Sequence, residues 1–247
     1  KLRFAAPTHL IDINNIPGLA HIKEEGGYLH IGALTRESDL EESDIITSRY
    51  HIFTDASKLI ADPQVRNFGT IGGNIAHGDA ANDHPAVMIA MNAEVEIAGQ
   101  EGKRQVGIDD FFYGFYMTAV QHGEILTNIR IPIPQGKFGT AYYKSERKVG
   151  DYAAAGVAVM VEIGADGTCT NAGIGLTNVN PLPMRAARSQ EALIGSKLTD
   201  DDIAKAAKYA AEDCNPSDDL RGDEDYKRHL VKVITKRMLK QAISRAK

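Results

Sequence analysis

The sequence has few of the residues that build iron–sulfur or zinc sites, membrane spans or surfaces that bind nucleic acid. Only two of its 247 residues are cysteine, and neither Cys169 nor Cys214 belongs to a Cys-x-x-Cys pair. This scarcity argues against an iron–sulfur or zinc site built by this chain alone, and it fits a reducing cytoplasm. No apolar run approaches the roughly 20 residues of a membrane span. The formal net charge of −5 argues against general nucleic-acid binding, which usually needs a basic surface.

The first residues also lack familiar signals. The chain does not begin with methionine, and no apolar leader follows Lys1, so we expect a processed, truncated or cleaved start and not a secretory signal. The hydrophobic fraction of 43% and the charged fraction of 25% are ordinary for a globular protein with a sizeable core. The length suffices for one large domain or two ordinary ones.

Hydrophobic patterning predicts an α+β protein, because mixed strands and helices come first, then strands followed by helices. The expected strands are 9–13, 28–32, 93–98, 124–132, 142–144, 153–163 and 168–176. The expected helices are 34–40 (capped by Thr35 or Ser38), 53–60, 85–91, 189–194, 203–211 and 226–246. A proline-rich stretch at 132–136 is the best linker candidate, and it divides 1–136 from 137–247.

The most informative stretch is 66–74, which reads Arg-Asn-Phe-Gly-Thr-Ile-Gly-Gly-Asn. Three glycines in five positions let the backbone turn tightly and approach a ligand. The exposed peptide N–H groups, together with the Thr70 hydroxyl, would suit phosphate oxygens. No Lys-Ser/Thr follows the glycines and no Gly-x-Gly-x-x-Gly opens a helix, so neither common phosphate loop is present. Asp83, nine positions after Asn74, could contact the ligand or be the N-cap of the next helix, and both roles can hold together.

The longer string 63–77 resembles the flavin-binding medium subunits of molybdenum hydroxylases, such as aerobic carbon monoxide dehydrogenases, and the middle region of xanthine dehydrogenase. Further motifs of that family follow in order at 79–85, 123–126, 147–153 and 217–228, so the resemblance spans nearly the whole chain. It implies an FAD-binding PCMH-type domain over 1–136 without its first subdomain. A carbon monoxide dehydrogenase flavoprotein C-terminal-like domain, a three-stranded antiparallel sheet with a helical bundle, would occupy 137–247.

The resemblance implies an oxidoreductase subunit of a heteromeric complex in the cytoplasm. A large subunit would oxidise the substrate at a molybdopterin cofactor. The [2Fe–2S] clusters of a small subunit would then pass the electrons to FAD in this chain, and FAD would pass them to an external acceptor. It implies no catalytic acid–base pair in this chain, while the composition predicts no metal site, no nucleic-acid binding and no membrane span. The residues that it places against FAD are Ile60, Ala61, Thr70, Ile71, Gly72, Gly73, Asn74, Asp83, Leu126 and Lys144.

The sequence departs from the family's pattern at its start. An Ala-Gly-Gly-Gln-Ser-like loop, the family's first flavin motif, has no match upstream of Lys1. We therefore expect weak FAD binding, or none, by this chain alone, and a flavin-less scaffold subunit of the same kind of complex is the alternative. A flavin enzyme acting alone on its own substrate would need acid–base residues that the C-terminal region does not offer. The chain specifies neither the substrate nor the terminal acceptor.

Several residues also have simpler structural explanations. Aromatic residues at the spacing of Tyr113, Phe115 and Tyr116 are typical of a core, although stacking on a flavin is the alternative. Lysines are usually exposed, so Lys144 is expected at the surface unless it serves the flavin.

The histidines near the glycine stretch and the cations of the last helix have plain interpretations as well. His77 and His84 are expected to be structural or solvated, because no nucleophile or carboxylate triad accompanies them. The lysines and arginines of 227–245 predict the solvated face of an amphipathic helix, with a docking surface for a partner subunit as the alternative.

Overall fold

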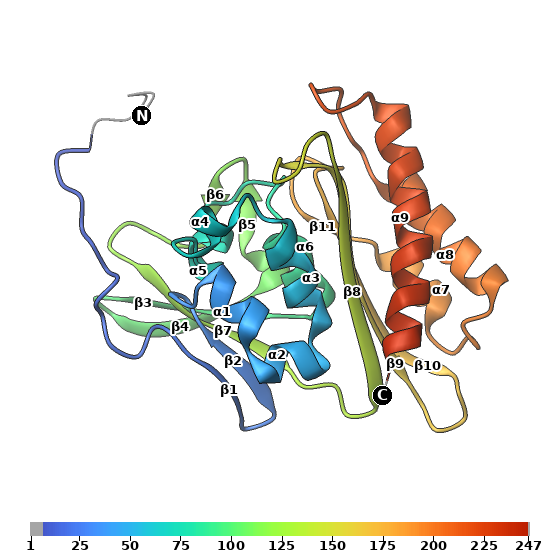
Figure 1. Cartoon of the computed structure of the whole chain (residues 1–247), viewed down its shortest axis with the longest axis horizontal. Helices are drawn as coiled ribbons and strands as arrows, with labels where there is room; N and C mark the ends of the chain where they lie inside the picture. The colour runs from blue at the N-terminus through green and yellow to red at the C-terminus, as the bar shows by residue number, and fades with distance from the viewer. Residues whose placement is uncertain (1–6, 247) are drawn as a thin grey trace.

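A computed structural model describes residues 7–246, and two antiparallel sheets with helices between and outside them make up the chain (Figure 1). The expected α+β class is confirmed. The first sheet has the strand order β1-β2-β7-β3-β4. Its strands are β1 (Ile22–Glu25), β2 (Tyr28–Gly32), β7 (Ile125–Pro132), β3 (Glu94–Gly99) and β4 (Gly102–Gly107). A separate short hairpin pairs β5 (Phe112–Gly114) with β6 (Met117–Thr118), just after a 3-10 turn at Ile108–Asp110.

Buried and half-buried side chains alternate along the central strands of the first sheet and so give it two different faces. In β7, Ile129 and Ile131 are fully buried while Asn128 and Arg130 turn to the other face. The hairpin predicted before β2 is confirmed, because Gly26 and the glycine after it both have positive φ, as a tight turn between twisted strands requires.

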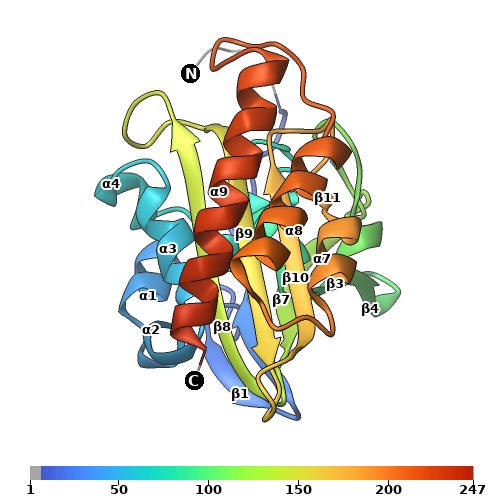
Figure 2. The ribbon, with the colours of Figure 1, turned by 90° about the vertical axis from the view of Figure 1, so that its right-hand side faces the viewer.

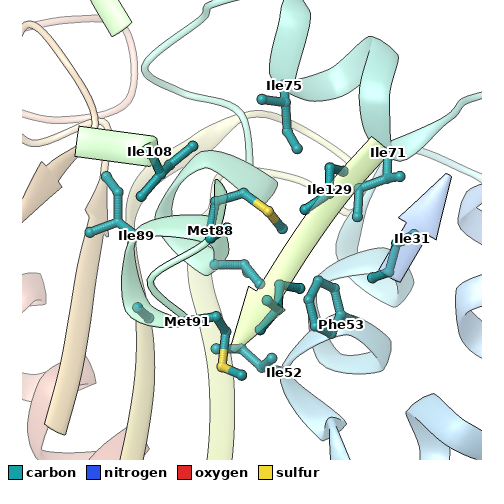
Figure 3. Close-up of a cluster of buried hydrophobic side chains, with 14 of the residues drawn as sticks. Ile31, Ile52, Phe53, Ile71, Ile75, Met88, Ile89, Met91, Ile108 and Ile129 are labelled. Carbon is teal, nitrogen blue, oxygen red and sulfur yellow. The ribbon is translucent and has the colours of Figure 1, made fainter. Parts of the chain in front are cut away.

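Six short helices cover the apolar face of the first sheet and fill the space up to the second sheet (Figure 1). Side chains of Phe53, Met88 and Ile129 meet in the core between these layers (Figure 3). The second sheet contributes Phe138 and Tyr142 to the same core. The helices are α1 (Glu37–Glu42), α2 (Asp44–Arg49), α3 (His51–Leu59), α4 (Pro63–Arg66), α5 (Ile71–Ala76) and α6 (His84–Ala90).

The second sheet has the order β11-β10-β9-β8, and a helical layer covers its outer face (Figure 2). Its strands are β8 (Lys137–Glu146), β9 (Ala153–Ile163), β10 (Cys169–Thr177) and β11 (Met184–Arg185). The outer helices are α7 (Ala187–Leu193), α8 (Asp200–Asp213) and α9 (Glu224–Arg245). The three predicted strands are thus present, the first longer than expected, and β11 adds a two-residue fourth.

Helix α6 lies in direct backbone contact with β10. A Cβ atom added to Gly173 would lie 1.8 Å from the carbonyl oxygen of Ala90, and one added to Gly175 would lie 2.1 Å from that of Ala86. Any side chain at either glycine would therefore push the helix off the sheet. This contact fixes where α6 begins, which matters for the site below.

Two local expectations are wrong. The stretch 9–13 forms no strand, because no described strand pairs with it and the Leu10 side chain is 93% exposed. The first helix begins at Glu37 and neither Thr35 nor Ser38 caps it, since the Thr35 hydroxyl instead donates to a backbone carbonyl. The other predicted helices are confirmed within a few residues at each end. Among the described residues, no helix is long and apolar enough to cross a membrane.

Candidate functional site

The glycine stretch begins a helix. Thr70 is the N-cap of α5, and its hydroxyl accepts a hydrogen bond from the Gly73 N–H at 3.1 Å. The N–H groups of Ile71 and Gly72 donate to backbone carbonyls in the segment 33–35 at 3.1 and 3.0 Å. The expected cradle of exposed N–H groups is therefore wrong for these three donors, because the chain itself already satisfies them.

The glycines serve close packing more than turning. Neither Gly69, Gly72 nor Gly73 has a positive φ. A Cβ at Gly72 would lie 2.6 Å from both the Cβ and the carbonyl oxygen of Ala33, so only glycine lets α5 rest on that loop. Gly73 remains exposed, which leaves the backbone open to solvent at the first turn of the helix.

Asn74 carries an unsatisfied acceptor. Its side-chain Oδ1 is buried and has no hydrogen-bond partner, whereas buried polar atoms are normally paired. Its backbone carbonyl accepts a hydrogen bond from the Asn82 side-chain amide at 2.8 Å. The residue therefore joins α5 to the buried segment 79–84 and has one side-chain acceptor that no described residue pairs.

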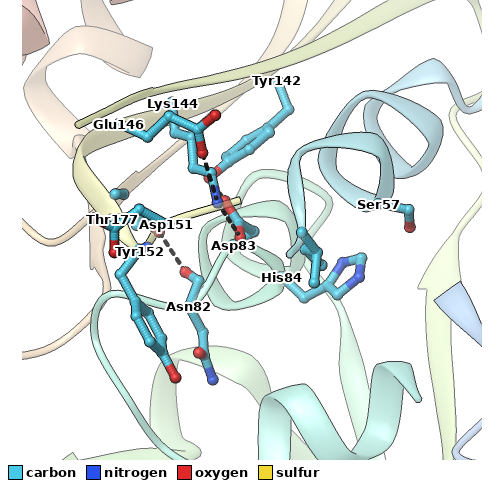
Figure 4. A network of polar contacts seen from close by, with 12 residues as sticks. Ser57, Asn82, Asp83, His84, Tyr142, Lys144, Glu146, Asp151, Tyr152 and Thr177 are labelled. Carbon is cyan, nitrogen blue, oxygen red and sulfur yellow. Dashed lines mark hydrogen bonds and ion pairs between the residues drawn. The ribbon is translucent and has the colours of Figure 1, made fainter. Parts of the chain in front are cut away.

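The segment 79–84 is the junction of the site (Figure 4). The Asp79 carboxylate accepts a hydrogen bond from the Tyr116 hydroxyl at 3.2 Å. The Asn82 carbonyl accepts one from the Thr177 hydroxyl of β10 at 2.9 Å. Bonds from this one segment thus reach α5, the β5–β6 hairpin and the second sheet.

Asp83 lies at the centre of a buried charge cluster (Figure 4). Its carboxylate accepts hydrogen bonds from the Tyr142 hydroxyl at 2.5 Å and from Lys144 Nζ at 3.0 Å. Lys144 Nζ also lies 3.6 Å from the Glu146 carboxylate. Burial raises the pKa of Asp83, and Lys144 and Tyr142 only partly offset that rise.

Two expectations about this cluster are corrected. Lys144 is only 2% exposed, because β8 carries it inward to meet Asp83 instead of outward to solvent. Asp83 occupies the N-cap position of α6 but makes no capping bond, since both carboxylate oxygens are engaged by the second sheet.

The remaining predicted residues lie around this network. Ile60 is the C-cap of α3 and is half-buried. The carbonyl oxygen of Ala61 lies so near Gly150 that a Cβ there would approach it to 2.4 Å, so the turn after β8 rests on Ala61. Leu126 packs in the first core with Ile71. Hydrogen bonds join Thr70, Gly73 and Asn74 to Asn82, and the next residue in the chain, Asp83, is paired with Lys144. Ile60 and Leu126 lie outside both groups.

The tyrosines of the site had no predicted role. Tyr152 is 45% exposed and follows Asp151 in the turn after β8 (Figure 4). Burial and the nearby Asp79 carboxylate raise the pKa of Tyr152. Arg221 forms a 3.1 Å ion pair with Asp151, and its guanidinium lies 5.6 Å from the centre of the Tyr152 ring. The motifs at 147–153 and 217–228 contained these residues, but spacing alone gave them no role.

The histidines beside the site have structural surroundings. His84 is fully buried, and its Nε2 lies 2.7 Å from the Glu37 carboxylate, which also accepts a hydrogen bond from Ser57. Burial acts to raise the pKa of Glu37, but His84 and Ser57 outweigh it and hold that pKa below its usual value. His77 is exposed, with its ring 4.9 Å from that of Tyr116. Both positions agree with the structural or solvated interpretation.

The aromatic cluster is not part of the core. Tyr113, Phe115 and Tyr116 are 63%, 67% and 50% exposed. They occupy the β5–β6 hairpin, where the preceding Phe111 and Phe112 take the inward positions. Within the described chain, no group of three His, Cys, Asp or Glu residues could hold a metal ion.

Comparisons with known proteins agree with this geometry. The family described as the FAD binding domain in molybdopterin dehydrogenase matches residues 1–134. The CO dehydrogenase flavoprotein C-terminal domain matches residues 140–242. The chain belongs to this family of FAD-binding subunits. The predicted resemblance, the oxidoreductase class and the FAD-binding character are thereby confirmed.

The similarity to individual relatives extends over the whole chain. The carbon monoxide dehydrogenase medium chain of Hydrogenophaga pseudoflava is 46% identical over 99% of this chain and 85% of its own length. That of Afipia carboxidovorans is 42% identical over 100% of this chain and 85% of its own. A solved structure of the Hydrogenophaga pseudoflava enzyme lacking the Mo-pyranopterin moiety superposes with a TM-score of 0.95, at 48% identity. The superposition covers 100% of this chain and 86% of the solved chain.

Proposed function

We propose that this chain is the electron-transferring flavin subunit of a molybdenum hydroxylase complex. It would take electrons from [2Fe–2S] clusters of a small partner subunit and deliver them to an external acceptor, after a large subunit has oxidised the substrate at molybdenum. Bound FAD supplies the redox chemistry, and the protein supplies position and electrostatics. The observation that carries the proposal is the match to the FAD binding domain over residues 1–134, within which the buried, unpaired Oδ1 of Asn74 ends the glycine motif.

We further propose how the chain's own residues hold the cofactor. The Asn74 Oδ1 accepts a hydrogen bond from a cofactor hydroxyl, and the Thr70 hydroxyl, which already accepts from Gly73, donates its proton to a phosphate oxygen. The protein wall beside the diphosphate and ribityl chain is formed by Ile71, Gly72 and Gly73. The adenine side is lined by Ile60 and Ala61. Leu126 offers an apolar contact near the ring system. The domains are proposed as 1–136 and 137–247.

The buried cluster would give the site a fixed electrostatic environment. Lys144 is held by two carboxylates, so its ammonium group needs no rearrangement when charge changes nearby. Tyr142 donates to the other carboxylate oxygen of Asp83 and keeps the carboxylate oriented. We propose that Asp83 and Lys144 act on the ring system through this arrangement.

An FAD titration of Asn74→Leu tests the assignment. Leucine keeps the approximate size of asparagine and removes the acceptor, which should cost about 1 kcal/mol and raise the dissociation constant about fivefold. Quenching of flavin fluorescence reports binding to the chain within its complex. Asn15→Leu, at an exposed position outside the site, is the matched control.

The possible outcomes distinguish a wrong role for Asn74 from a wrong function for the chain. Unchanged FAD affinity in Asn74→Leu would contradict the role of Asn74 and leave the flavin subunit in place. A purified complex with no flavin absorbance would contradict the function itself and favour the flavin-less scaffold.

A further inference from the structure

The outer face of α9 carries a basic groove that no other part of the described chain covers. Figure 2 shows α9 on the outside of the helical layer, with α8 beside it. The groove has a volume of about 330 Å³. The residues that line it, here called the basic groove, are His229, Lys232, Val233, Lys236, Arg237 and Lys240.

The charges of the groove repel one another. Lys232, Lys236 and Lys240 follow at intervals of four residues and so lie on one side of the helix, where each like-charge pair costs about 0.2–0.5 kcal/mol. Lys240 is paired with Asp200 of α8 at 2.5 Å. Throughout residues 7–246, no carboxylate lies within ion-pairing distance of Lys232 or Lys236. In a chain with a net charge of −5, this cationic stripe is locally unbalanced.

The floor of the groove is apolar. Val233 is half-buried between the cations, and the aliphatic stems of its lysine and arginine neighbours form the walls. From His229 to Lys240 the groove follows about 17 Å of helix axis, roughly three turns. Charged rims around an apolar floor fit an amphipathic protein segment that lies along a helix.

We propose that α9 docks an acidic, amphipathic segment of another subunit of the complex, about three helical turns long, with one apolar side chain over Val233. This inference rests on the proposed function only because the complex supplies the partner. A nucleic acid or an anionic membrane is a poorer match, because the basic surface is short and the protein around it is net acidic.

Charge reversal at two lysines tests the groove. The variant Lys232→Glu/Lys236→Glu is compared with Lys205→Glu/Lys208→Glu, which makes the same charge change on exposed positions of α8. Both chains are produced with the cluster-bearing and molybdenum-binding subunits, and sedimentation velocity at low and high salt gives the affinity of the chain for the rest of the complex. We expect the groove variant to bind at least tenfold more weakly at low salt and the control to bind normally, with equal flavin content and helicity in both.

Carbodiimide cross-linking followed by mass spectrometry identifies the occupant. The groove predicts links from Lys232 or Lys236 to aspartate or glutamate of a partner subunit, and their loss in the groove variant. Equal assembly of the two variants would overturn the proposal, as would links only to a second copy of this chain. Reduced binding to phosphatidylserine vesicles or RNA, without any change in assembly, would overturn it too. A wild-type chain that binds FAD but joins no complex would contradict both this inference and the proposed electron transfer.

Discussion

Replacing Lys144 by methionine should destabilise the chain strongly, because it leaves the buried Asp83 carboxylate without its cation. Lys144 is 2% exposed and lies 3.0 Å from the Asp83 carboxylate and 3.6 Å from that of Glu146. Methionine keeps most of the side-chain volume, so lost packing contributes little. Removing one member of a buried ion pair typically costs 3–5 kcal/mol, and we expect a loss of about that size. In a chain of this length it corresponds to a melting temperature lower by about 6–20 °C.

The same variant has a characteristic pH dependence. Lys144 acts to lower the pKa of Asp83 and burial acts to raise it, so removing the lysine raises the folded-state pKa further. An acid whose folded-state pKa lies above its unfolded value stabilises the fold when protonated. That stability is present below the unfolded pKa and is lost as the pH rises through the folded pKa. The difference between wild type and variant should therefore be smaller at about pH 5 than at about pH 8.

Urea unfolding of the flavin-free chain measures this loss, and the double variant Lys144→Met/Asp83→Asn is the control. The amide carries no charge, so the double variant should lose less than the sum of the two single changes. A loss below about 1 kcal/mol in Lys144→Met, equal at both pH values, would refute the reasoning, because an exposed pair is worth no more than that.

Three further outcomes follow from buried contacts. Tyr142→Phe removes the hydroxyl that donates to Asp83. It should lower the free energy of unfolding, measured in urea, by about 1–3 kcal/mol and leave the backbone conformation unchanged. Glu37 has a lowered pKa, so its stabilisation is present above its unfolded pKa and is lost as the pH falls through the folded one. Glu37→Gln should flatten the acid limb of the stability profile. Gly139→Ala should lower the melting temperature markedly, because its Cβ would overlap a backbone carbonyl of α9, whereas Gly107→Ala has open space and should not.

The sequence predicted well those elements whose pattern follows from one buried face. The alternation of β7 is visible in the sequence because Ile129 and Ile131 must face the core while their neighbours do not. The long α9 was predictable for the same reason, from apolar residues along one side of the helix. Of these, Ile234, Met238 and Ala242 are buried, whereas Leu230 and Val233 are only half-buried. The resemblance supplied the family and its candidate residues, which periodicity could not.

Features that depend on distant partners were beyond the sequence. Lys144 is buried because Asp83, 61 residues earlier, meets it, and local pattern carries no sign of that pairing. The stretch 9–13 is apolar enough for a strand, but a strand also needs a neighbour with which to pair. The exposure of Phe115 and Tyr116 depends on which aromatic residues of one short hairpin fill the inward positions.

The backbone contact between α6 and β10 helps to position the helix at this site without using a charged side chain. Because Gly173 and Gly175 let the helix rest directly on the strand, backbone packing as well as the ion pair fixes the position of Asp83 at the start of α6. Substitutions at Asp83 or Lys144 can therefore change the local field while the scaffold keeps its geometry. In a protein built this way, a change at one of these charges costs stability, but the backbone frame that positions the remaining groups stays in place.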